Sequence, residues 1–432
     1  MELTELTNRA SDLRPRGVLG AELRLTLIEE HTAVLERDEV VHSTGASQAL
    51  TVQVWLDGDR SGTATGAPDA YDAVVERALA NAESGPPQDG PVQRQDREIG
   101  GLGIFDPRRA NISETHRADV LKSARQSVLA ADELEPGSFS YRDEQVTRRF
   151  ASSRGVALQE TGTRFVVQGS ATATAPDGDF VLNERIASRR FSSVATLPLG
   201  EFLARRARVV RQPGEGLPEG PVRVVLTPRA TAQLFTHLGP GFTAARIAEG
   251  AFFLTPGQAL DPRLHLVDDG LLAGGLTTRA FDDRGVSPVA LTLLRDGRLD
   301  GRFVTVAEAR THSVRPSGHL MNGELGPSNL VLKSGTRSVN ALLAELQGPS
   351  FRVDDLPDCS GVDLATGEAS LVVHGEVMEA NKAVGSMRHV RIAGQLTEVL
   401  GKLVEVCNDT DRWGAMDAPA LITQGWTLST AR

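Results

Sequence analysis

The chain has 432 residues, 40% of them hydrophobic, with 46 basic against 56 acidic residues and a formal net charge of −10. This charge, without a basic stripe interleaved with aromatic residues, argues against nucleic acid as a partner. No apolar run reaches the length of about 18 residues that a membrane span needs, and the amino terminus lacks the apolar core of a signal peptide. We therefore expect a soluble, cytoplasmic protein of two or three domains that does not bind membranes.

The basic residues are nearly all arginines, because lysine occurs only at Lys122, Lys333, Lys382 and Lys402. We interpret this bias as the mark of a GC-rich bacterial genome rather than of a function. The two cysteines, Cys359 and Cys407, are too few and too far apart for a disulfide scaffold.

The first half of the chain alternates between strand and helix patterns. Residues 21–58 have period-two alternation, which predicts strands with one buried face. A helical stripe follows at 68–84, and a second amphipathic helix is expected at 113–134. Strands separated by turn signals are expected over 138–193, and a further helix over 198–212.

The second half is predicted to be mainly strands. It opens with a buried strand at 222–226 and a helix at 228–238, with Thr227 as the cap and Pro228 in the first turn. A hairpin is expected around Asp296-Gly297 and two strands within 362–385. The stretch 390–409 is interpreted as a short helix, and 419–429 as a closing strand.

These patterns predict an α+β protein with a boundary at "PGEGLPEGP". Residues 1–212 would form an amino-terminal α/β domain with a mixed or antiparallel sheet and helices. Residues 213–221 would be the linker. Residues 222–432 would form a β-rich domain resembling a barrel or sandwich.

No motif in the chain defines a metal site. None of the nine histidines is followed by glutamate, and no two of them lie four or five residues apart. His312 and His319 are seven apart, but proline and glycine between them exclude one regular helix. Most of these histidines are expected to be surface or hydrogen-bonded loop residues.

Other catalytic patterns are also missing from the sequence. There is no G-x-S-x-G nucleophile elbow, and the glycine-rich stretches lack the spacing of a phosphate-binding loop. Cys407 is expected to be a buried small hydrophobic residue, and Cys359 an exposed loop residue. Three acidic pairs at predicted turns are interpreted as structural: Asp268–Asp269, Asp282–Asp283 and Asp354–Asp355.

The order and spacing of several segments resemble the TldD/TldE (PmbA, modulator-of-gyrase-type) metallopeptidase family over nearly the whole chain. In the first half these segments are "LTVQVWLDGDRSGTATG" and "SSRGVAL". In the second half they are "VVLTPRATAQLFTHL", "LVDDGLLAGGLTTRAFDDRGV", "LLRDGRLDGRFVT", "RPSGH", "VDLATGEASLVVHGEVMEANKAVG" and "LGKLVEVCND".

The resemblance implies that this chain has lost the zinc site of the family. In TldD-like chains an HExxxH sequence follows the "VVL" strand, and a downstream cysteine is a further ligand. Here Thr236 stands in the place of the first histidine, His237 in that of the glutamate and Gly241 in that of the second histidine. Cys407 does not match the ligand cysteine, whose region reads "WGAMD". This pattern resembles the metal-free TldE subunit.

The resemblance further implies a heterodimer in which a TldD-like partner carries the zinc. Such pairs cleave short or unfolded peptides, and a role in natural-product biosynthesis is the specialised version we expect. This chain would then have no catalytic residue, no metal ligand and no cofactor of its own, and would help to form a groove for an extended peptide. The residues expected to line the substrate or the interface are Thr236, His237, His319 and Asn322.

Two alternatives remain open from the sequence. The chain could be a self-sufficient biosynthetic enzyme that reuses the fold, with His237, His319 and Asn322 as the first candidates for its site. It could also be a homodimeric protein that binds peptides without chemistry.

Overall fold

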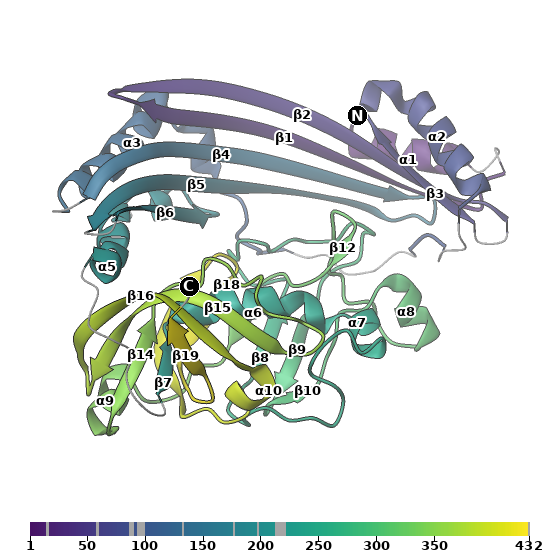
Figure 1. Cartoon of the computed structure of the whole chain (residues 1–432). Helices are drawn as coiled ribbons and strands as arrows, with labels where there is room; N and C mark the ends of the chain where they lie inside the picture. The colour runs from purple at the N-terminus through teal and green to yellow at the C-terminus, as the bar shows by residue number, and fades with distance from the viewer. Residues whose placement is uncertain are drawn as a thin grey trace.

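The computed structural model describes residues 1–13, 17–57, 60–85, 90–92, 100–131, 134–175, 178–196, 198–211 and 222–430. The linker expected at 213–221 lies outside the described residues, so the division of the chain there stays a prediction. Elsewhere helices and two large sheets confirm the α+β class. In Figure 1 the long strands of the amino-terminal half arch over the carboxy-terminal half.

The amino-terminal sheet is antiparallel throughout and has six strands in the order β3-β2-β1-β4-β5-β6. The β1–β2 hairpin keeps one unbroken register from Gly20↔Trp55 to Glu36↔Glu39. This length explains the arch, because long paired strands accumulate the right-handed twist of the backbone. The strands are β1 (Gly20–Glu36), β2 (Glu39–Trp55), β3 (Ser61–Gly66), β4 (Leu134–Ser152), β5 (Ala157–Ala175) and β6 (Gly178–Ser188).

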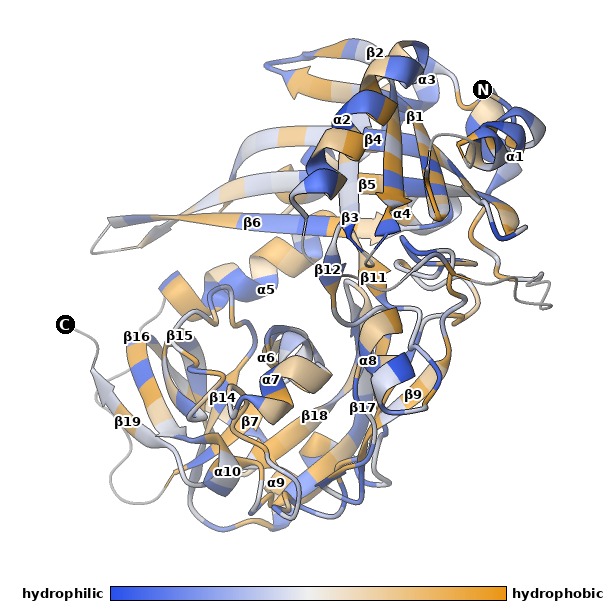
Figure 2. Cartoon of the chain, turned by 90° about the vertical axis from the view of Figure 1, so that its right-hand side faces the viewer, coloured by the Kyte–Doolittle hydropathy of each residue, from blue (hydrophilic) through white to orange (hydrophobic). Residues whose placement is uncertain are grey.

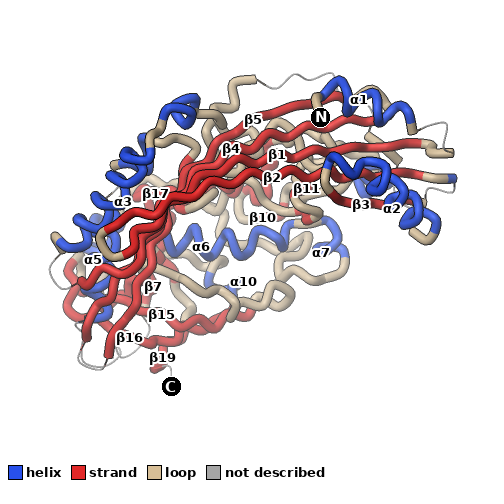
Figure 3. Tube along the Cα trace, turned by 90° about the horizontal axis from the view of Figure 1, so that it is seen from above, coloured by secondary structure: helices blue, strands red, loops and turns tan. Residues whose placement is uncertain are grey.

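Helices cover the same face of this sheet at its two ends (Figure 3). Leu23 and Leu25 of β1 pack with α1 and α2 at one end, while Ala33 and Leu35 pack with α3 at the other. All four have odd numbers, as the period of a strand requires for one face. The helices are α1 (Leu3–Asp12), α2 (Tyr71–Glu83), α3 (Glu114–Leu129), α4 (Ser192–Ala195) and α5 (Leu199–Arg211), with the short turns η3 (Pro68–Ala70) and η4 (Pro107–Asn111).

The carboxy-terminal half is built on an eleven-stranded mixed sheet in the order β10-β9-β8-β13-β18-β7-β14-β15-β16-β19, with β17 paired to β18. The pairs β7–β14 and β13–β18 are parallel. Within it β18, hydrophobic along most of its length in Figure 2, is buried at every position except Asp417. The strands are β7 (Arg223–Leu226), β8 (Leu266–Asp269), β9 (Ala290–Arg295), β10 (Arg298–Leu299), β13 (Leu330–Leu332), β14 (Pro349–Val353), β15 (Glu368–Glu379), β16 (Lys382–Gln395), β17 (Glu405–Trp413), β18 (Met416–Thr423) and β19 (Thr427–Thr430).

Helix α6 (Pro228–Leu238) packs against β17 and β18 of this sheet. Its apolar residues belong to the largest core of the molecule. The smaller elements are η5 (Gly239–Phe242), α7 (Ala244–Ala248), α8 (Val306–Thr311), the hairpin of β11 (Leu320–Met321) and β12 (Glu324–Leu325), α9 (Val339–Glu345) and α10 (Leu396–Val399).

The helix expected across residues 390–409 is wrong. Residues up to Gln395 continue β16, where Val390 and Ile392 are buried and Arg391 is exposed, as in a strand with period two. Only Leu396–Val399 is helical, and β17 begins at Glu405. A short apolar run is compatible with both periods, and pairing with β15 decides for the strand.

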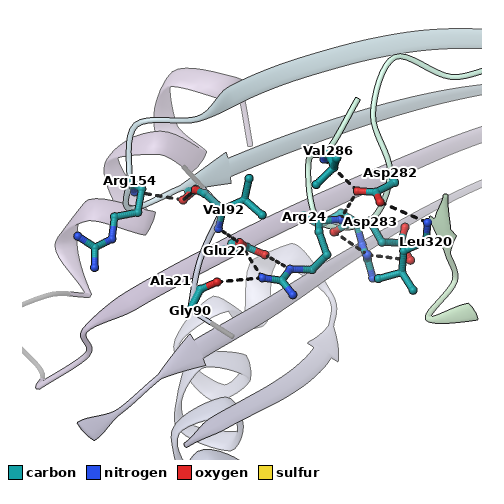
Figure 4. A network of polar contacts seen from close by, with 12 residues as sticks. Ala21, Glu22, Arg24, Gly90, Val92, Arg154, Asp282, Asp283, Val286 and Leu320 are labelled. Carbon is teal, nitrogen blue, oxygen red and sulfur yellow. Dashed lines mark hydrogen bonds and ion pairs between the residues drawn. The ribbon is translucent and has the colours of Figure 1, made fainter. Parts of the chain in front are cut away.

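A buried ion pair joins the two halves at one end of the arch (Figure 4). The carboxylate of Glu22 on β1 accepts a hydrogen bond from the Arg284 guanidinium at 2.7 Å and another from the backbone N–H of Val92 at 2.6 Å. Arg284 also donates to the carbonyl of Gly90 and lies over the Trp55 ring, 5.2 Å from its centroid. Burial raises the pKa of Glu22 despite Arg284.

The loop that carries Arg284 is held by its own acidic pair. Asp282 is buried and accepts the backbone N–H groups of Arg284, Val286 and Leu320. Burial raises the pKa of Asp282 although these donors oppose the shift. The neighbouring Asp283 pairs with Arg24 of β1 at 3.0 Å. The structural interpretation of this acidic pair therefore holds, with the addition that it docks one half on the other.

We expect R284M to destabilise the protein by about 3–5 kcal/mol at neutral pH, because Glu22 would be left buried without its cation. The pKa of Glu22 is already raised above 4.5, and losing Arg284 raises it further. A carboxyl group whose pKa is raised by folding destabilises the folded state as the pH rises above 4.5. The stability that R284M loses relative to the wild type should therefore grow from pH 4.5 to pH 7. Urea unfolding at both pH values measures this.

The matched control is R295M, which breaks the exposed pair of Arg295 with Asp300 and should leave the unfolding midpoint unchanged. The double variant E22Q/R284M should recover part of the lost stability. An R284M deficit that is absent, or equal at the two pH values, would contradict the role given to this pair.

Candidate functional site

The candidate site is built on the strand–helix unit β7–α6, and the sequence explains its geometry. Thr227 caps the helix: its side chain accepts the Ala230 N–H and its hydroxyl donates to the Asp354 carbonyl at 3.1 Å. Pro228 occupies the first turn, where its missing N–H costs nothing. These features confirm the predicted strand, cap and helix.

A cavity of about 620 Å³ lies where α6 meets β6 and α5 of the amino-terminal half and β15 of the carboxy-terminal half. Its walls combine apolar and polar side chains in equal number. The apolar residues are Phe180, Val181, Leu182, Val209, Val210, Leu356, Pro357, Val372, Val373 and Trp413. The polar residues are Asn183, Arg206, Arg229, Gln233, Thr236, His237, Asp354, Asp355, Cys359 and His374.

Four charged residues from four segments form a network beside this cavity, and three of them, Arg206, Arg229 and Asp355, line it. Arg229 of α6 lies 2.6 Å from Glu184 of β6 and 2.9 Å from Asp355. Arg206 of α5 lies 2.7 Å from Asp355 and 3.7 Å from Glu184. Burial opposes the charge of Arg229, but Asp355 and Glu184 outweigh it and raise its pKa. All four charges are compensated, and the network ties the two halves together.

Gln233 extends the network into the loop after β14. Its amide nitrogen donates to Asp355 at 2.6 Å, and its amide oxygen accepts the N–H of Leu356 at 2.7 Å. Because buried polar groups are costly unless they are paired, this arrangement fixes the loop against α6. Asp354 is held by Arg352 at 3.1 Å.

Phe180 and His374 line another part of the cavity and belong to a cluster of aromatic and histidine rings. The ring of Phe180 on β6 packs edge-on against His374 of β15 and lies close to His389 of β16. The Arg388 guanidinium lies over the same ring, 5.1 Å from its centroid. Burial, with His389 and Arg388 nearby, lowers the pKa of His374 to about 4, so this ring is neutral at physiological pH.

The structure brings two of the four expected site residues into this cavity. Thr236 and His237 both line it from the last turn of α6. His237 is half-buried, and its Nε2 lies 3.5 Å from the carbonyl oxygen of Val362. The assignment of these residues to substrate or interface stays a prediction.

The other two residues lie elsewhere. His319 is buried in the carboxy-terminal half, with Nε2 2.7 Å from Asp268 and Nδ1 2.7 Å from the Ser317 carbonyl. Both ring nitrogens therefore face oxygen atoms of the same half, which fixes the ring in the interior away from the cavity. Asn322 is exposed in the turn between β11 and β12, in the left-handed region with φ 52°.

Neither cysteine is an activated thiol. Cys359 lines the cavity but is buried, which corrects the expectation that it is exposed. Burial and the nearby Asp358 and Asp355 raise its pKa to about 11, so it is protonated at neutral pH. Cys407 is fully buried as expected, and burial raises its pKa to about 12.

The residues at the zinc positions of the resemblance do not fit the metal. A Cβ at Gly241 would lie 2.2 Å from two ring atoms of Phe252, so no histidine side chain fits there. Phe252 is held between Phe242 and Phe253, each 4.9 Å away between ring centroids. Thr236 offers no strong zinc ligand. No group of three or more His, Cys, Asp or Glu side chains suited to a metal occurs among the described residues.

The cavity is therefore suited to binding. It offers apolar walls and hydrogen-bonding side chains, with compensated charges, a neutral His374 and a protonated Cys359. Sequence reasoning missed Glu184, Arg206, Arg229 and His374, and it gave Asp355 only a structural role at a turn. No spacing links them, because the network joins residues as far apart as 184 and 355, and only the packing of the two halves brings them together.

Comparisons with known proteins give a consistent picture. Residues 219–430 match the family model described as PmbA/TldA metallopeptidase C-terminal domain. The chain is 23% identical to a metalloprotease PmbA homolog of Haemophilus influenzae, covering 99% of this chain and 96% of that protein. It is 25% identical to the metalloprotease PmbA of Escherichia coli, in an alignment that covers 95% of this chain and 92% of that protein.

Solved structures share the fold over the whole chain. A putative modulator of DNA gyrase from Thermotoga maritima has a TM-score of 0.87 at 20% identity, covering 99% of this chain and all of that one. TldE from Thermococcus kodakarensis has a TM-score of 0.82 at 17% identity, covering 98% and 100%. No helix among the described residues is long and apolar enough to cross a membrane.

We expect G241A to destabilise the protein by about 1–3 kcal/mol, because the added methyl group collides with Phe252 in a filled core. Chemical denaturation measures the change. G326A is the matched control, because a Cβ there meets no atom within 4 Å. Equal stability of G241A and G326A would show that the site can open to admit a side chain.

A second prediction concerns pH. The pKa of His374 is about 4 in the folded protein against 6.5 for a free histidine, so stability present above pH 6.5 is lost as the pH falls towards 4. H374N should reduce the fall in melting temperature between pH 7 and pH 5. H312N, at an exposed histidine, should retain the full fall. An unchanged pH dependence in H374N would contradict a half-buried neutral ring.

Proposed function

Because the chain belongs to the PmbA/TldD family of metallopeptidases, we propose that it is the metal-free, TldE-like subunit of a two-chain peptidase. The observation that carries the proposal is the packing of Phe252 against Gly241, which leaves no room for a zinc ligand at the place the family pattern requires. A TldD-like partner would hold the zinc and supply the chemistry. The assembly would act in the cytoplasm.

In this proposal the cavity at α6 contributes to substrate binding. Its walls are apolar at Phe180, Val181 and Leu356, and polar at Asn183 and Gln233, a mixture that suits a segment of an extended peptide. Short or unfolded peptides fit this description, and so do peptide precursors of natural products. The chain itself positions and encloses the substrate and performs no bond cleavage.

The test is to co-express the chain with the TldD-like protein of the same genome, with an affinity tag on this chain only. We expect a one-to-one complex with one zinc ion, which cleaves unstructured peptides only when both chains are present. H237A in this chain should leave the zinc content unchanged, because the metal belongs to the partner.

Zinc bound stoichiometrically by the lone chain, together with peptidase activity, would refute the proposal. It would favour the alternative of a self-sufficient enzyme on the same fold. A lone chain that binds peptides and never captures a zinc-bearing partner would instead favour a pure binding protein.

A further inference from the structure

The outer edge of β2 is free along most of its length. The short strand β3 pairs only with Leu50–Trp55, and within the described part of the chain no strand pairs with the outer side of residues 39–49. Figures 1 and 2 both show β2 as the outermost strand of the arch at the end that lies away from β3. The segment therefore presents a row of unused backbone hydrogen-bonding groups.

The backbone groups that point outward follow from the hydrogen bonds at the end of β2. The N–H of Leu56 donates to the Arg60 carbonyl on the β3 side, while the Trp55 carbonyl accepts from Leu19 on the β1 side. Direction alternates along a strand, and the β1–β2 register has no bulge, so even-numbered residues face outward. Along the free edge these are Val40, His42, Thr44, Ala46 and Gln48.

This edge has none of the usual protection against strand pairing. Residues 39–49 contain no proline, no lysine and no bulge, and Glu39 is their single charged residue. The opposite edge differs, because the Arg206 guanidinium donates to the Asn183 carbonyl of β6 at 2.5 Å. Beside the free edge, the cross-strand neighbours Val34 and Val41 are 38% and 51% exposed.

The edge is compatible with a copy of itself. In antiparallel pairing about a two-fold axis through Thr44, His42 would lie opposite Ala46 of the copy and Val40 opposite Gln48. Ser43 would face Gly45, and Glu39 would face Ala49, so no like charges meet and no large side chains collide. Each of the five outward residues would donate one backbone hydrogen bond and accept one.

We propose that a second copy of this chain docks on the free edge of β2, residues 39–49, by antiparallel strand pairing centred on Thr44. The two six-stranded sheets become one continuous sheet across the two-fold axis. This assembly is separate from the cavity at α6 and does not depend on the proposed peptidase partner.

The test introduces a charge at Thr44, the residue on the two-fold axis. Light scattering and sedimentation of the isolated wild-type chain should give a concentration-dependent dimer. T44K and T44E each place like charges opposite one another and should raise the dimer dissociation constant by about tenfold or more. An equimolar mixture of the two variants should restore the dimer, because the opposed residues then attract.

A backbone variant tests the strand pairing itself. A46P removes an outward N–H that makes no bond to β1, so the monomer should keep its circular dichroism and melting temperature while dimerisation is lost. The matched control A46T keeps the N–H and should dimerise like the wild type. If A46P fails to fold, the charge-swapped pair still decides the question.

A wild-type chain that is monomeric across the micromolar range, or a mixture of T44K and T44E that fails to restore the dimer, would overturn the proposal. If A46P instead weakened only the complex with a zinc-bearing subunit, the edge would belong to that partner and self-pairing would be wrong. Failure to find any zinc-bearing subunit would leave the wild-type dimer unaffected, so the two proposals fail separately.

Discussion

Two buried carboxylates on the long sheet, Glu22 and Glu184, meet arginines of the carboxy-terminal half, and the position of the cavity depends on them. Glu22 holds Arg284 at one end of the arch, and Glu184 holds Arg229 at the other. A charge inside a protein is tolerated only when it is paired and hydrogen-bonded. Both contacts therefore require the two halves to stay docked, and the sheet is fixed at two distant points.

This constraint explains why the site is assembled from so many segments. The wall of the cavity takes residues from β6 and α5 of one half and from α6 and β15 of the other. The network of Arg206, Arg229, Asp355 and Glu184 joins the two halves, and all of its residues except Glu184 also line the cavity. A change in the joint therefore changes the shape of the site.

Periodicity in the sequence was sufficient for the long hairpins, for helices α2, α3 and α5 and for the unit β7–α6 with its Thr227 cap, but helix α1 was not predicted. It failed at residues 390–409, where the pairing of β16 with β15 and of β17 with β18 overrides a helix-compatible pattern. The resemblance predicts that the zinc ligands are lost, and this stays a prediction, whereas the contact of Gly241 with Phe252 could not be inferred from the sequence. The ion network could not be predicted from the sequence either, because residues 184, 206, 229 and 355 become neighbours only through tertiary packing.

Docking at both ends has a consequence for how the cavity meets a ligand. A site fixed before binding loses little conformational entropy of its own, so the entropic cost of association falls mainly on the incoming molecule. A flexible peptide gives up backbone and side-chain freedom in proportion to the length that becomes ordered. For the peptide ligand proposed above, short segments would then be favoured over long ones, and differences in affinity among them would appear chiefly as differences in residence time.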